Sequence, residues 1–440
     1  MAPSTKHTPL SGSVSSVNKP QDKYWYIHGK AYDLSEFVER HPGGKFVLLN
    51  TQGKNVTELF ESSHSLSSID VKKMLQKYEV SHVPAVDCPF TFEEGGVYDE
   101  LKTKVKELFA ARKNPSHHWN FNFFLRIACM LALYTSMFYV AFVRGSLLAA
   151  AFVGSWWMMV MFCLGHDASH FAITKSETVN KWCMYIVTHW GLWNGSIWFQ
   201  HHCYGHHSYT GIAQKDPDLR NGSALLRKHP FFPWKSIHQY QHFFMLFLYL
   251  LLPNQYIGQV IEYLKARRRG KIFGVPLVNN AQEPLVDMIG CRCVEAASIF
   301  CHFILPFLFH SPLSAVALIW VYFTCVGCCY YAIVAPNHDT HVTDKDDTPE
   351  KIDWGEQQIR HSSNFSHDNP VLTALFGGMN YQIEHHLFPT VCHVHYPEIS
   401  KIVKEVCQRR GLQYNLLPGL LSAHFSVIRN YYHLGKEKSE

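Results

Sequence analysis

The chain has 440 residues, of which 47% are hydrophobic, 14% aromatic and 17% charged, and its net charge is only +5. So small a charge argues against a protein that binds nucleic acid through a basic surface. The apolar composition favours a membrane protein with soluble parts. The 13 cysteines form no regular framework, which is typical of a reducing compartment.

The N-terminal part of the chain is predicted to be soluble. Residues 1–20 are rich in Ser, Thr, Pro and Lys and contain no apolar segment, which predicts a disordered leader and not a signal peptide. Residues 21–95 are predicted to form a small domain that begins with two short strands around a glycine turn. A short helix follows and ends at the His-Pro-Gly-Gly segment 41–44, where proline and glycine require a loop.

This segment, together with His64 at the expected separation, resembles the cytochrome b5 family. The resemblance implies a haem b whose iron is ligated by His41 and His64 from opposite faces. Two axial imidazoles leave no open position, so such a haem passes electrons and does not bind oxygen. The resemblance also implies an NADH-cytochrome b5 reductase as electron donor, and the acidic residues that are candidates to dock its basic surface are Glu36, Glu39, Glu58, Glu61 and Asp70.

Residues 96–120 are predicted to be a linker with an amphipathic helix, because Leu101, Val105, Leu108 and Phe109 recur at helical spacing between charged residues. We expect this helix to lie on the surface and to lead towards the membrane.

Residues 121–440 are predicted to form a membrane domain. Apolar runs long enough to cross, or nearly so, lie at 121–143, 147–164, 296–309 and 313–334. The Trp-rich stretch 181–199 is predicted to lie at the membrane interface, and the short run 243–252 to lie in the interface or to be re-entrant. Four crossings place the N-terminus, the C-terminus and the histidine clusters described next on the cytosolic side.

Three histidine clusters occur near the ends of these apolar segments. They comprise His166 and His170, then His201, His202, His206 and His207, and finally His385 and His386 with Gln382 three residues earlier. Imidazoles without nearby thiolate pairs suit iron, zinc or copper, and so many imidazoles point to two ions. One further histidine, His338 or His341, follows the last apolar run and is a plausible ligand.

The segments 166–170, 200–207 with Asp-Pro-Asp at 216–218, and 382–389 resemble the front-end group of membrane fatty acyl desaturases with a fused cytochrome b5. The resemblance covers nearly all residues after 20. It implies an α+β cytochrome b5 domain followed by an all-α integral membrane domain, with about four transmembrane helices and a cytosolic di-iron cap. Gln382 in place of a histidine is typical of this group. The late histidine of the family stands in an Asn-His pair, which favours His338 over His341.

The implied active site contains two non-haem irons and uses O2 as co-substrate. The implied ligands are His166, His170, His202, His206, His207, His338, His385 and His386, with Gln382 counted among the catalytic residues. The wide spacing of the second cluster leaves the choice between His201 and His202 open.

Helical periodicity adds detail to this site. His166 and His170 are expected to share one helix face, as are His202 and His206, with His207 turned aside. Asp167, Glu384, Asp216 and Asp218 are candidates to orient imidazoles, although the last two fit a helix cap nearly as well. His189 is either a partner of the site or a core histidine.

The expected function is insertion of a cis double bond between an existing one and the carboxyl end of a polyunsaturated acyl chain. The expected position is 4 or 5 of C20–C22 chains, linked to CoA or to a phospholipid, in the endoplasmic reticulum. The head group would meet Arg227, Lys228, Lys235 or Arg267–Arg269. Alternatives are a delta-6 or delta-8 desaturase, a sphingolipid long-chain-base desaturase, a hydroxylase, or a membrane-anchored haem electron carrier without catalysis.

Overall fold

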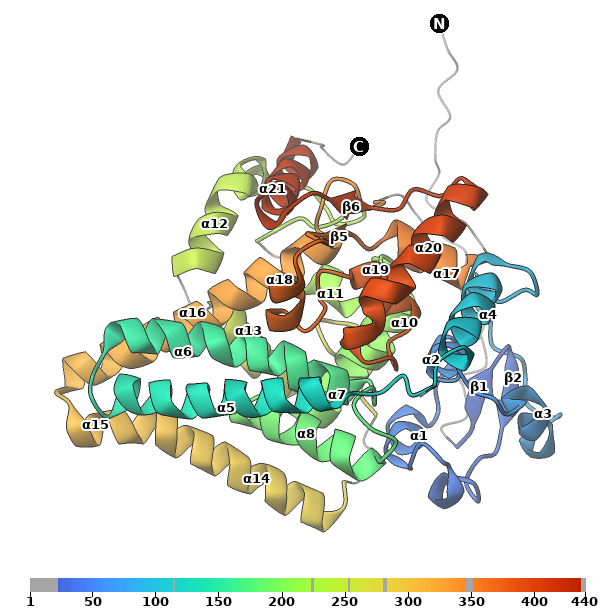
Figure 1. Cartoon of the computed structure of the whole chain (residues 1–440), viewed down its shortest axis with the longest axis horizontal. Helices are drawn as coiled ribbons and strands as arrows, with labels where there is room; N and C mark the ends of the chain where they lie inside the picture. Colours follow the sequence, from blue (N-terminus) through green and yellow to red (C-terminus); the bar gives the residue numbers. More distant parts are fainter. Residues whose placement is uncertain are drawn as a thin grey trace, which may run out of the picture.

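The computed structural model describes residues 23–113, 115–222, 225–251, 254–279, 283–345 and 351–436. The predicted leader, residues 1–20, lies outside this described part. The described chain has a small N-terminal α/β unit, a set of long helices that run side by side, and a helical cap between the two (Figure 1).

The N-terminal unit follows the predicted pattern. Strands β1 (Trp25–Ile27) and β2 (Lys30–Tyr32) pair antiparallel around His28 and Gly29, both of which have positive φ. The short helices that follow enclose the predicted haem loop, and they are η1 (Val38–Arg40), α1 (Phe46–Thr51), α2 (Thr57–Ser63), α3 (Val71–Leu75) and η2 (Gln76–Tyr78). His41 ends η1 and His64 ends α2, so the two predicted ligands stand at two helix ends.

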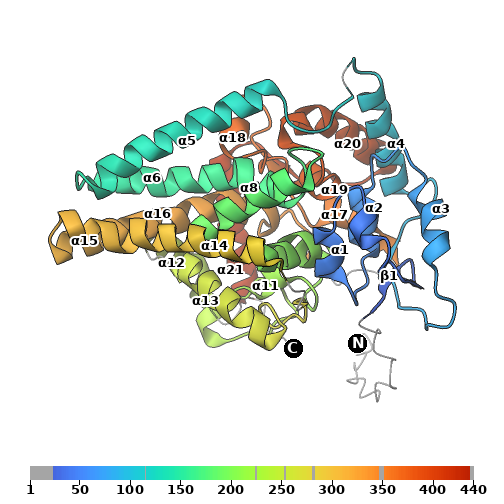
Figure 2. The ribbon, with the colours of Figure 1, turned by 90° about the horizontal axis from the view of Figure 1, so that it is seen from below.

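In the described residues, four helices are long and apolar enough to cross a membrane, as predicted, and Figure 2 shows them side by side. They are α5 (Phe121–Phe142), α6 with η3 and α7 (Leu147–Ser169), α14 with η6 and α15 (Leu285–Phe309), and α16 (Pro312–His338). The third begins at Leu285 and not at residue 296. Its charged first half escaped prediction because Asp287 pairs with Lys181 and Glu295 with His189.

The stretch predicted as one interfacial helix at 181–199 is broken. Helix α8 (Glu177–Trp190) packs on α14, and α9 (Gly195–Trp198) begins after a turn in which Leu192 has a φ of 58°. The short apolar run near 243–252 forms α12 (Gln241–Leu251), which has 11 residues and packs on α16 and on α21 (Leu420–Lys436). Helix α12 is too short to span a membrane.

The cap gathers short elements from distant parts of the chain. Two parallel strand pairs join β3 (Phe90–Thr91) to β4 (Ile352–Asp353) and β5 (Asn364–Phe365) to β6 (Leu416–Leu417). The remaining helices of the described chain are α4 (Val97–Ala110), α10 (His207–Tyr209), α11 (Pro217–Arg220), η5 (Ser236–Tyr240), α13 (Asn254–Arg269), α17 (Trp354–Arg360), α18 (Pro370–Leu375), α19 (Gln382–Leu387), η7 (His393–His395) and α20 (Tyr396–Arg410), with the π-helix η4 (Phe199–His206) before α10.

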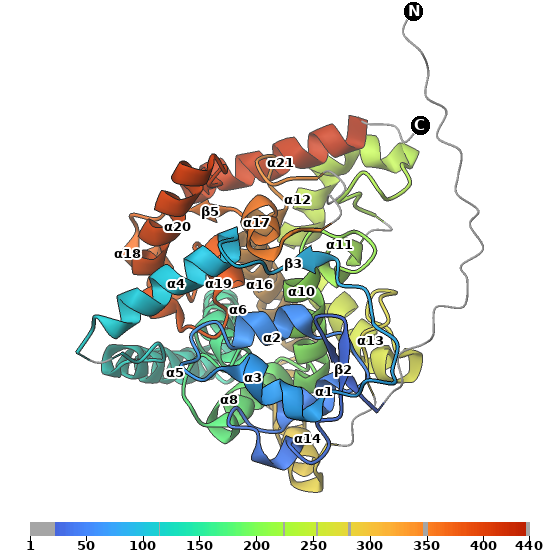
Figure 3. The same cartoon turned by 90° about the vertical axis from the view of Figure 1, so that its right-hand side faces the viewer.

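Helix α4 is the predicted amphipathic helix, and its apolar face packs on the cap. Tyr98, Leu101 and Val105 are fully buried, and the helix packs on α20 and α17. Figure 3 shows α4 lying across the cap beside α2, so the linker helix ties the N-terminal unit to the cap.

We predict that Tyr98→Ala lowers the free energy of unfolding by about 3 to 5 kcal/mol, because it opens a cavity in a packed core. The Tyr98 ring lies 4.7 Å from the Trp354 ring, and its hydroxyl donates to the Leu387 carbonyl at 3.1 Å. Thermal denaturation in detergent measures the change. Tyr139→Ala, at a tyrosine that is 54% exposed, is the matched control. Equal melting temperatures for the two variants would contradict the packing role of α4.

Candidate metal centres

His41 and His64 face each other across the N-terminal unit. Their ring centroids are 6.2 Å apart and their planes are nearly perpendicular. The Nδ1 atom of His41 donates to the Gly44 carbonyl and that of His64 to the Phe60 carbonyl, both at 2.8 Å. Each Nε2 atom is therefore an unprotonated acceptor, and metal–nitrogen bonds of about 2 Å would fit between the two rings.

The surroundings of this pair favour neutral imidazoles. Burial lowers the pKa of both His41 and His64 below the usual value. Aromatic rings line the pair, with Phe37 5.7 Å from His41 and Phe60 4.7 Å from His64. A planar apolar group with an iron ion at its centre fits this pocket.

The acidic residues predicted to dock a reductase divide into two sets. Glu58 and Glu61 are only 0% and 4% exposed, so they are not available to a partner protein. Burial raises the pKa of Glu58 to about 7, whereas Glu61 is paired with Lys102 at 2.9 Å. The docking prediction is therefore wrong for these two, because helix α2 faces the cap and not solvent. Glu36, Glu39 and Asp70 are exposed.

Five of the predicted metal ligands form one buried group at the end of the long helices. His166, His170, His202, His207 and His385 each offer a nitrogen atom within 4.8 Å of the others. The Nε2 atoms of His166 and His202 are 2.9 Å apart, and that of His207 lies 3.3 Å from His202 and 3.0 Å from His385. These five side chains come from α6 and its extension, from η4 and α10, and from α19.

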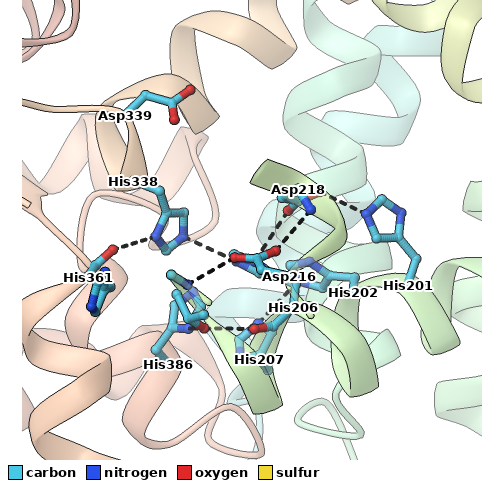
Figure 4. A network of polar contacts seen from close by, with 12 residues as sticks. His201, His202, His206, His207, Asp216, Asp218, His338, Asp339, His361 and His386 are labelled. Atoms are coloured by element: carbon cyan, nitrogen blue, oxygen red, sulfur yellow. Dashed lines mark hydrogen bonds and ion pairs between the residues drawn. The ribbon is translucent and has the colours of Figure 1, made fainter. Parts of the chain in front are cut away.

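The other three predicted ligands form a second group beside the first. His206, His338 and His386 converge in the same way, and Figure 4 shows His206 and His386 on neighbouring segments with His338 above them. The Nε2 atoms of His206 and His338 are 3.3 Å apart. The Gln382 amide nitrogen lies 3.0 Å from His338 Nε2, so the glutamine of the third cluster faces this second group.

A π-helix decides which histidine belongs to which group. Residues Phe199–His206 form η4, where the chain has more residues per turn than in an α-helix. His202 and His207, five residues apart, therefore face the same group. The prediction that paired His202 with His206 is wrong for this reason: their rings are parallel with centroids 5.6 Å apart, but their ligand nitrogens belong to different groups.

Neighbouring side chains hold the outward ring nitrogens of several of these histidines. A ring whose outer nitrogen donates a hydrogen bond presents its other nitrogen to a metal in a fixed orientation. The contacts are His206 Nδ1 to Asp216 at 3.1 Å, His338 Nδ1 to the His361 carbonyl at 2.8 Å, His385 Nδ1 to the Tyr396 hydroxyl at 3.1 Å, and His386 Nδ1 to the Gln358 side chain at 2.9 Å. Sequence reasoning missed Gln358, His361 and Tyr396, which stand in no recognisable pattern.

Of the predicted carboxylate partners, Asp216 contacts the ligand His206, as expected. Asp218 accepts from His201, which belongs to neither group, at 2.8 Å and lies 3.5 Å from His206. Asp216 also caps α11 by accepting from the Asp218 amide, so both proposed roles are filled. Asp167 and Glu384 were predicted wrongly. Successive side chains on a helix point in different directions, and these two turn away from the metal groups: Asp167 accepts from His393 and Glu384 from Asn364 and Tyr414.

The three histidines of open role lie outside both groups. His201 is held between Asp218 and the Tyr263 hydroxyl, which leaves His202 as the member of the first group. His341 bonds to Ser426 at 2.7 Å. His189 bonds to Glu295 at 2.7 Å and accepts from the Gly195 amide, so it is a satisfied core histidine.

The two groups have the properties of metal sites. The Nε2 atom of His386 and Gln382 Oε1 are buried without a hydrogen-bond partner. Burial, together with the neighbouring imidazoles, holds the pKa of His202, His207, His385 and His386 well below the usual value. Neutral nitrogen atoms that converge without protons to share are unfavourable when buried, and cations between them would satisfy them.

His206 differs from the other ligands in its electrostatics. Burial alone would lower its pKa, but Asp216 and Asp218 outweigh burial and raise it to about 9. The two carboxylates therefore favour a positive charge at this ring, carried by a proton or by a metal ion.

We predict that Asp216→Asn weakens metal binding in the second group by about 10- to 100-fold, because His206 loses the carboxylate that orients it. Metal analysis of purified protein should then find less metal than in the wild type. Asp368→Asn, at an exposed aspartate of the same cap, should leave the content unchanged. Wild-type metal content in Asp216→Asn after dialysis against a chelator would contradict the orienting role.

Comparisons with known proteins agree with both parts of the chain. Residues 145–418 match the family described as "Fatty acid desaturase" and residues 12–83 match "Cytochrome b5-like Heme/Steroid binding domain". The chain is 28% identical to "Probable Delta(5) fatty acid desaturase C" of Dictyostelium discoideum, over 97% of this chain and 95% of the relative. It is 29% identical to "Acyl-lipid (8-3)-desaturase" of Mortierella alpina, over 97% of each.

A third relative, "Acyl-lipid (8-3)-desaturase" of Physcomitrium patens, is 30% identical over 94% of this chain and 89% of its own length. The b5-like domain implies a haem, and the desaturase match with its histidine groups implies a di-iron centre and the use of O2. The predicted fusion is thus confirmed, whereas the predicted boundaries at residues 95 and 120 stay predictions. The chain belongs to the fatty acid desaturase family and is a membrane oxidoreductase with an N-terminal cytochrome b5-like domain.

Proposed function

We propose that this enzyme is a front-end desaturase, which inserts a cis double bond between an existing one and the carboxyl end of a polyunsaturated acyl chain. The observation that carries the proposal is the convergence of eight imidazoles and Gln382 in two adjacent groups. The relatives named Delta(5) and (8-3) desaturases support it, because they align over nearly the whole chain.

We further propose that the two groups hold one iron each. The ligands would be His166, His170, His202, His207 and His385 for one iron, and His206, His338 and His386 with Gln382 beside them for the other. When bound, the irons would use O2, two electrons from the haem and two protons to remove two hydrogens from adjacent methylenes, with two waters as the other product.

The chain's own residues would prepare this chemistry. The outward partners Asp216, Tyr396 and Gln358 orient imidazoles before any metal arrives, which lowers the reorganisation needed during reaction. Seven of the eight imidazoles are buried and His338 is half-buried, so bulk water is kept from the reacting centre.

A narrow cavity near the first group is the proposed path for part of the acyl chain. It is too tight to hold a water molecule in this structure, so the lining side chains would have to move apart, and it is lined by Met158, Trp193, Tyr256, Gln259, Gly327 and Tyr330. The Trp193 ring stacks on Trp198, which stacks on the His202 imidazole with centroids 4.5 Å apart. The cavity therefore lies two stacked side chains away from a proposed iron ligand, between α6, α13 and α16.

The predicted head-group anchor needs correction. Arg227 is buried and donates to the carbonyls of Pro230, Phe232 and Leu434, and Lys228 donates to the Asp218 carbonyl. Both stabilise the fold and are not available to a phosphate. The exposed residues Arg267–Arg269 at the end of α13 and Lys235 are the remaining candidates.

The position of the new double bond, the substrate and the location of the enzyme are also proposals. We propose position 4 or 5 of C20–C22 chains, with positions 6 and 8 or a sphingolipid base as alternatives, and a catalytic cap facing the cytosol from the endoplasmic reticulum. The Delta(5) relatives favour position 5, and the relatives named acyl-lipid desaturases favour a lipid-linked substrate. A reductase would meet the exposed Glu36, Glu39 and Asp70.

We predict that yeast without polyunsaturated lipids, fed single fatty acids, forms new double bonds on the carboxyl side of all existing ones. Mass spectrometry of the lipids locates each bond. His385→Ala, which removes a proposed iron ligand, is the negative control and should form none. A new bond on the methyl side of every existing one would overturn the front-end assignment.

We also predict that Met158→Trp, which fills the cavity, lowers desaturation about tenfold or more because the acyl chain can no longer align with the irons. Haem and iron content should stay at wild-type values. Met159→Trp is the matched control, because its side chain does not line the cavity. Equal product yields from both variants would show that the chain takes another path.

A further inference from the structure

The N-terminal unit is packed closely against the helix that carries the second histidine cluster. Helix α1 contacts η4, and α2 contacts α10. Figure 3 labels α1, α2 and α10 on this side of the molecule. Phe46 at the start of α1 is 6% exposed and lies among rings of the membrane domain. Its centroid is 5.2 Å from Phe199, 6.0 Å from Tyr185 and 6.1 Å from Phe171.

Glu177 fixes this contact from the membrane domain. Its Oε1 atom accepts a hydrogen bond from the Phe46 amide at 2.7 Å. Gly44 lies against the same carboxylate: a Cβ atom there would come within 2.0 Å of Glu177 Cδ, and its φ is +87°. The second glycine of the His-Pro-Gly-Gly loop thus gives Glu177 the space to reach the Phe46 amide.

Other polar contacts also hold the N-terminal unit against the membrane domain. The Gln200 side chain donates to the Asn50 side chain at 3.1 Å, and the Tyr204 hydroxyl donates to the Asn55 carbonyl at 3.0 Å. The Asn279 side chain donates to the Leu49 carbonyl at 3.1 Å. Gln200 and Tyr204 belong to η4, which also carries His202 and His206, so the N-terminal unit and the metal-ligand helix are joined directly.

We propose that Glu177 is a positioning residue that docks the haem loop onto the membrane domain and so sets an electron path through the ring of Phe46. The proposal rests on the proposed function. Phe171 directly follows His170, and Phe199 lies on η4 with His202, so the rings that Phe46 contacts belong to residues close in the chain to two proposed iron ligands.

The redox step on this path balances as a one-electron transfer. With both cofactors bound, the haem iron would lose one electron and one non-haem iron would gain it. Each double bond would need two such transfers, and a nicotinamide-dependent reductase would supply the electrons that return the haem to the reduced state.

The first test needs neither metal nor haem activity. In Glu177→Ala the Phe46 amide loses a charged acceptor, so hydrogen exchange in residues 44–49 should become about tenfold or more faster. Glu177→Gln keeps an acceptor oxygen and should retain most of the protection. Exchange around His64 should not change in either variant. Unchanged exchange at residues 44–49 in Glu177→Ala would overturn the docking role.

The second test measures the rate of electron transfer from the haem. Chemically reduced haem, mixed rapidly with O2 and acyl substrate, should be reoxidised about tenfold or more slowly in Glu177→Ala than in the wild type, with Glu177→Gln close to the wild type. Haem spectrum and iron content should be the same in all three. Glu94→Ala, at an exposed glutamate, is the control and should match the wild type.

Two results with Glu177→Ala overturn the proposal: unchanged exchange, or faster exchange with unchanged reoxidation, which would leave docking without an electron path. A wild-type reoxidation rate that falls on dilution would also overturn it, because transfer would then occur between molecules. Failure of the proposed function is a separate result, seen as the absence of new double bonds in yeast, and it leaves the hydrogen-exchange result intact.

Discussion

The structure depends on the burial of eight imidazole rings whose nitrogen atoms converge in two groups. Such atoms are unfavourable inside a protein unless something positive lies between them. In the first group the Nε2 atoms of His166 and His202 are 2.9 Å apart and both rings are buried. The surrounding cap holds rings of both groups in place, through contacts such as Tyr396 to His385 in the first group and Asp216 to His206 in the second. Metal binding and the stability of the cap are therefore linked.

The same constraint explains the unusual backbone of the site. The backbone becomes π-helical where the first two histidine clusters begin, at Met161–His166 after α6 and at Phe199–His206 after the short helix α9. A π-helical turn changes the direction of each side chain without ending the helix. It directs His202 and His207 to one group and His206 to the other, and it presents Gln200 and Tyr204 on the outer face of η4, where the b5-like unit is docked.

Most of the fold and much of the site could be predicted from sequence, because the signals are local. The His-Pro-Gly-Gly loop, the apolar runs and the histidine clusters each depend on residues close in the chain, and the preference for His338 over His341 agrees with the placement of His338 beside His206. What failed depends on tertiary packing. We applied the α-helical period to residues 199–206, which form the π-helix η4. The sequence also does not indicate that Arg227 is buried and donates hydrogen bonds to backbone carbonyls. The inward Glu58 was missed for the same reason.

The most direct test is the metal content and ligation of the purified wild-type enzyme. We predict about two irons beyond the haem iron. X-ray absorption at the iron edge should show nitrogen and oxygen ligands and no sulfur, since both groups are built from imidazoles with Gln382 beside them. Active enzyme that holds zinc in place of iron, or one non-haem iron only, would contradict the account.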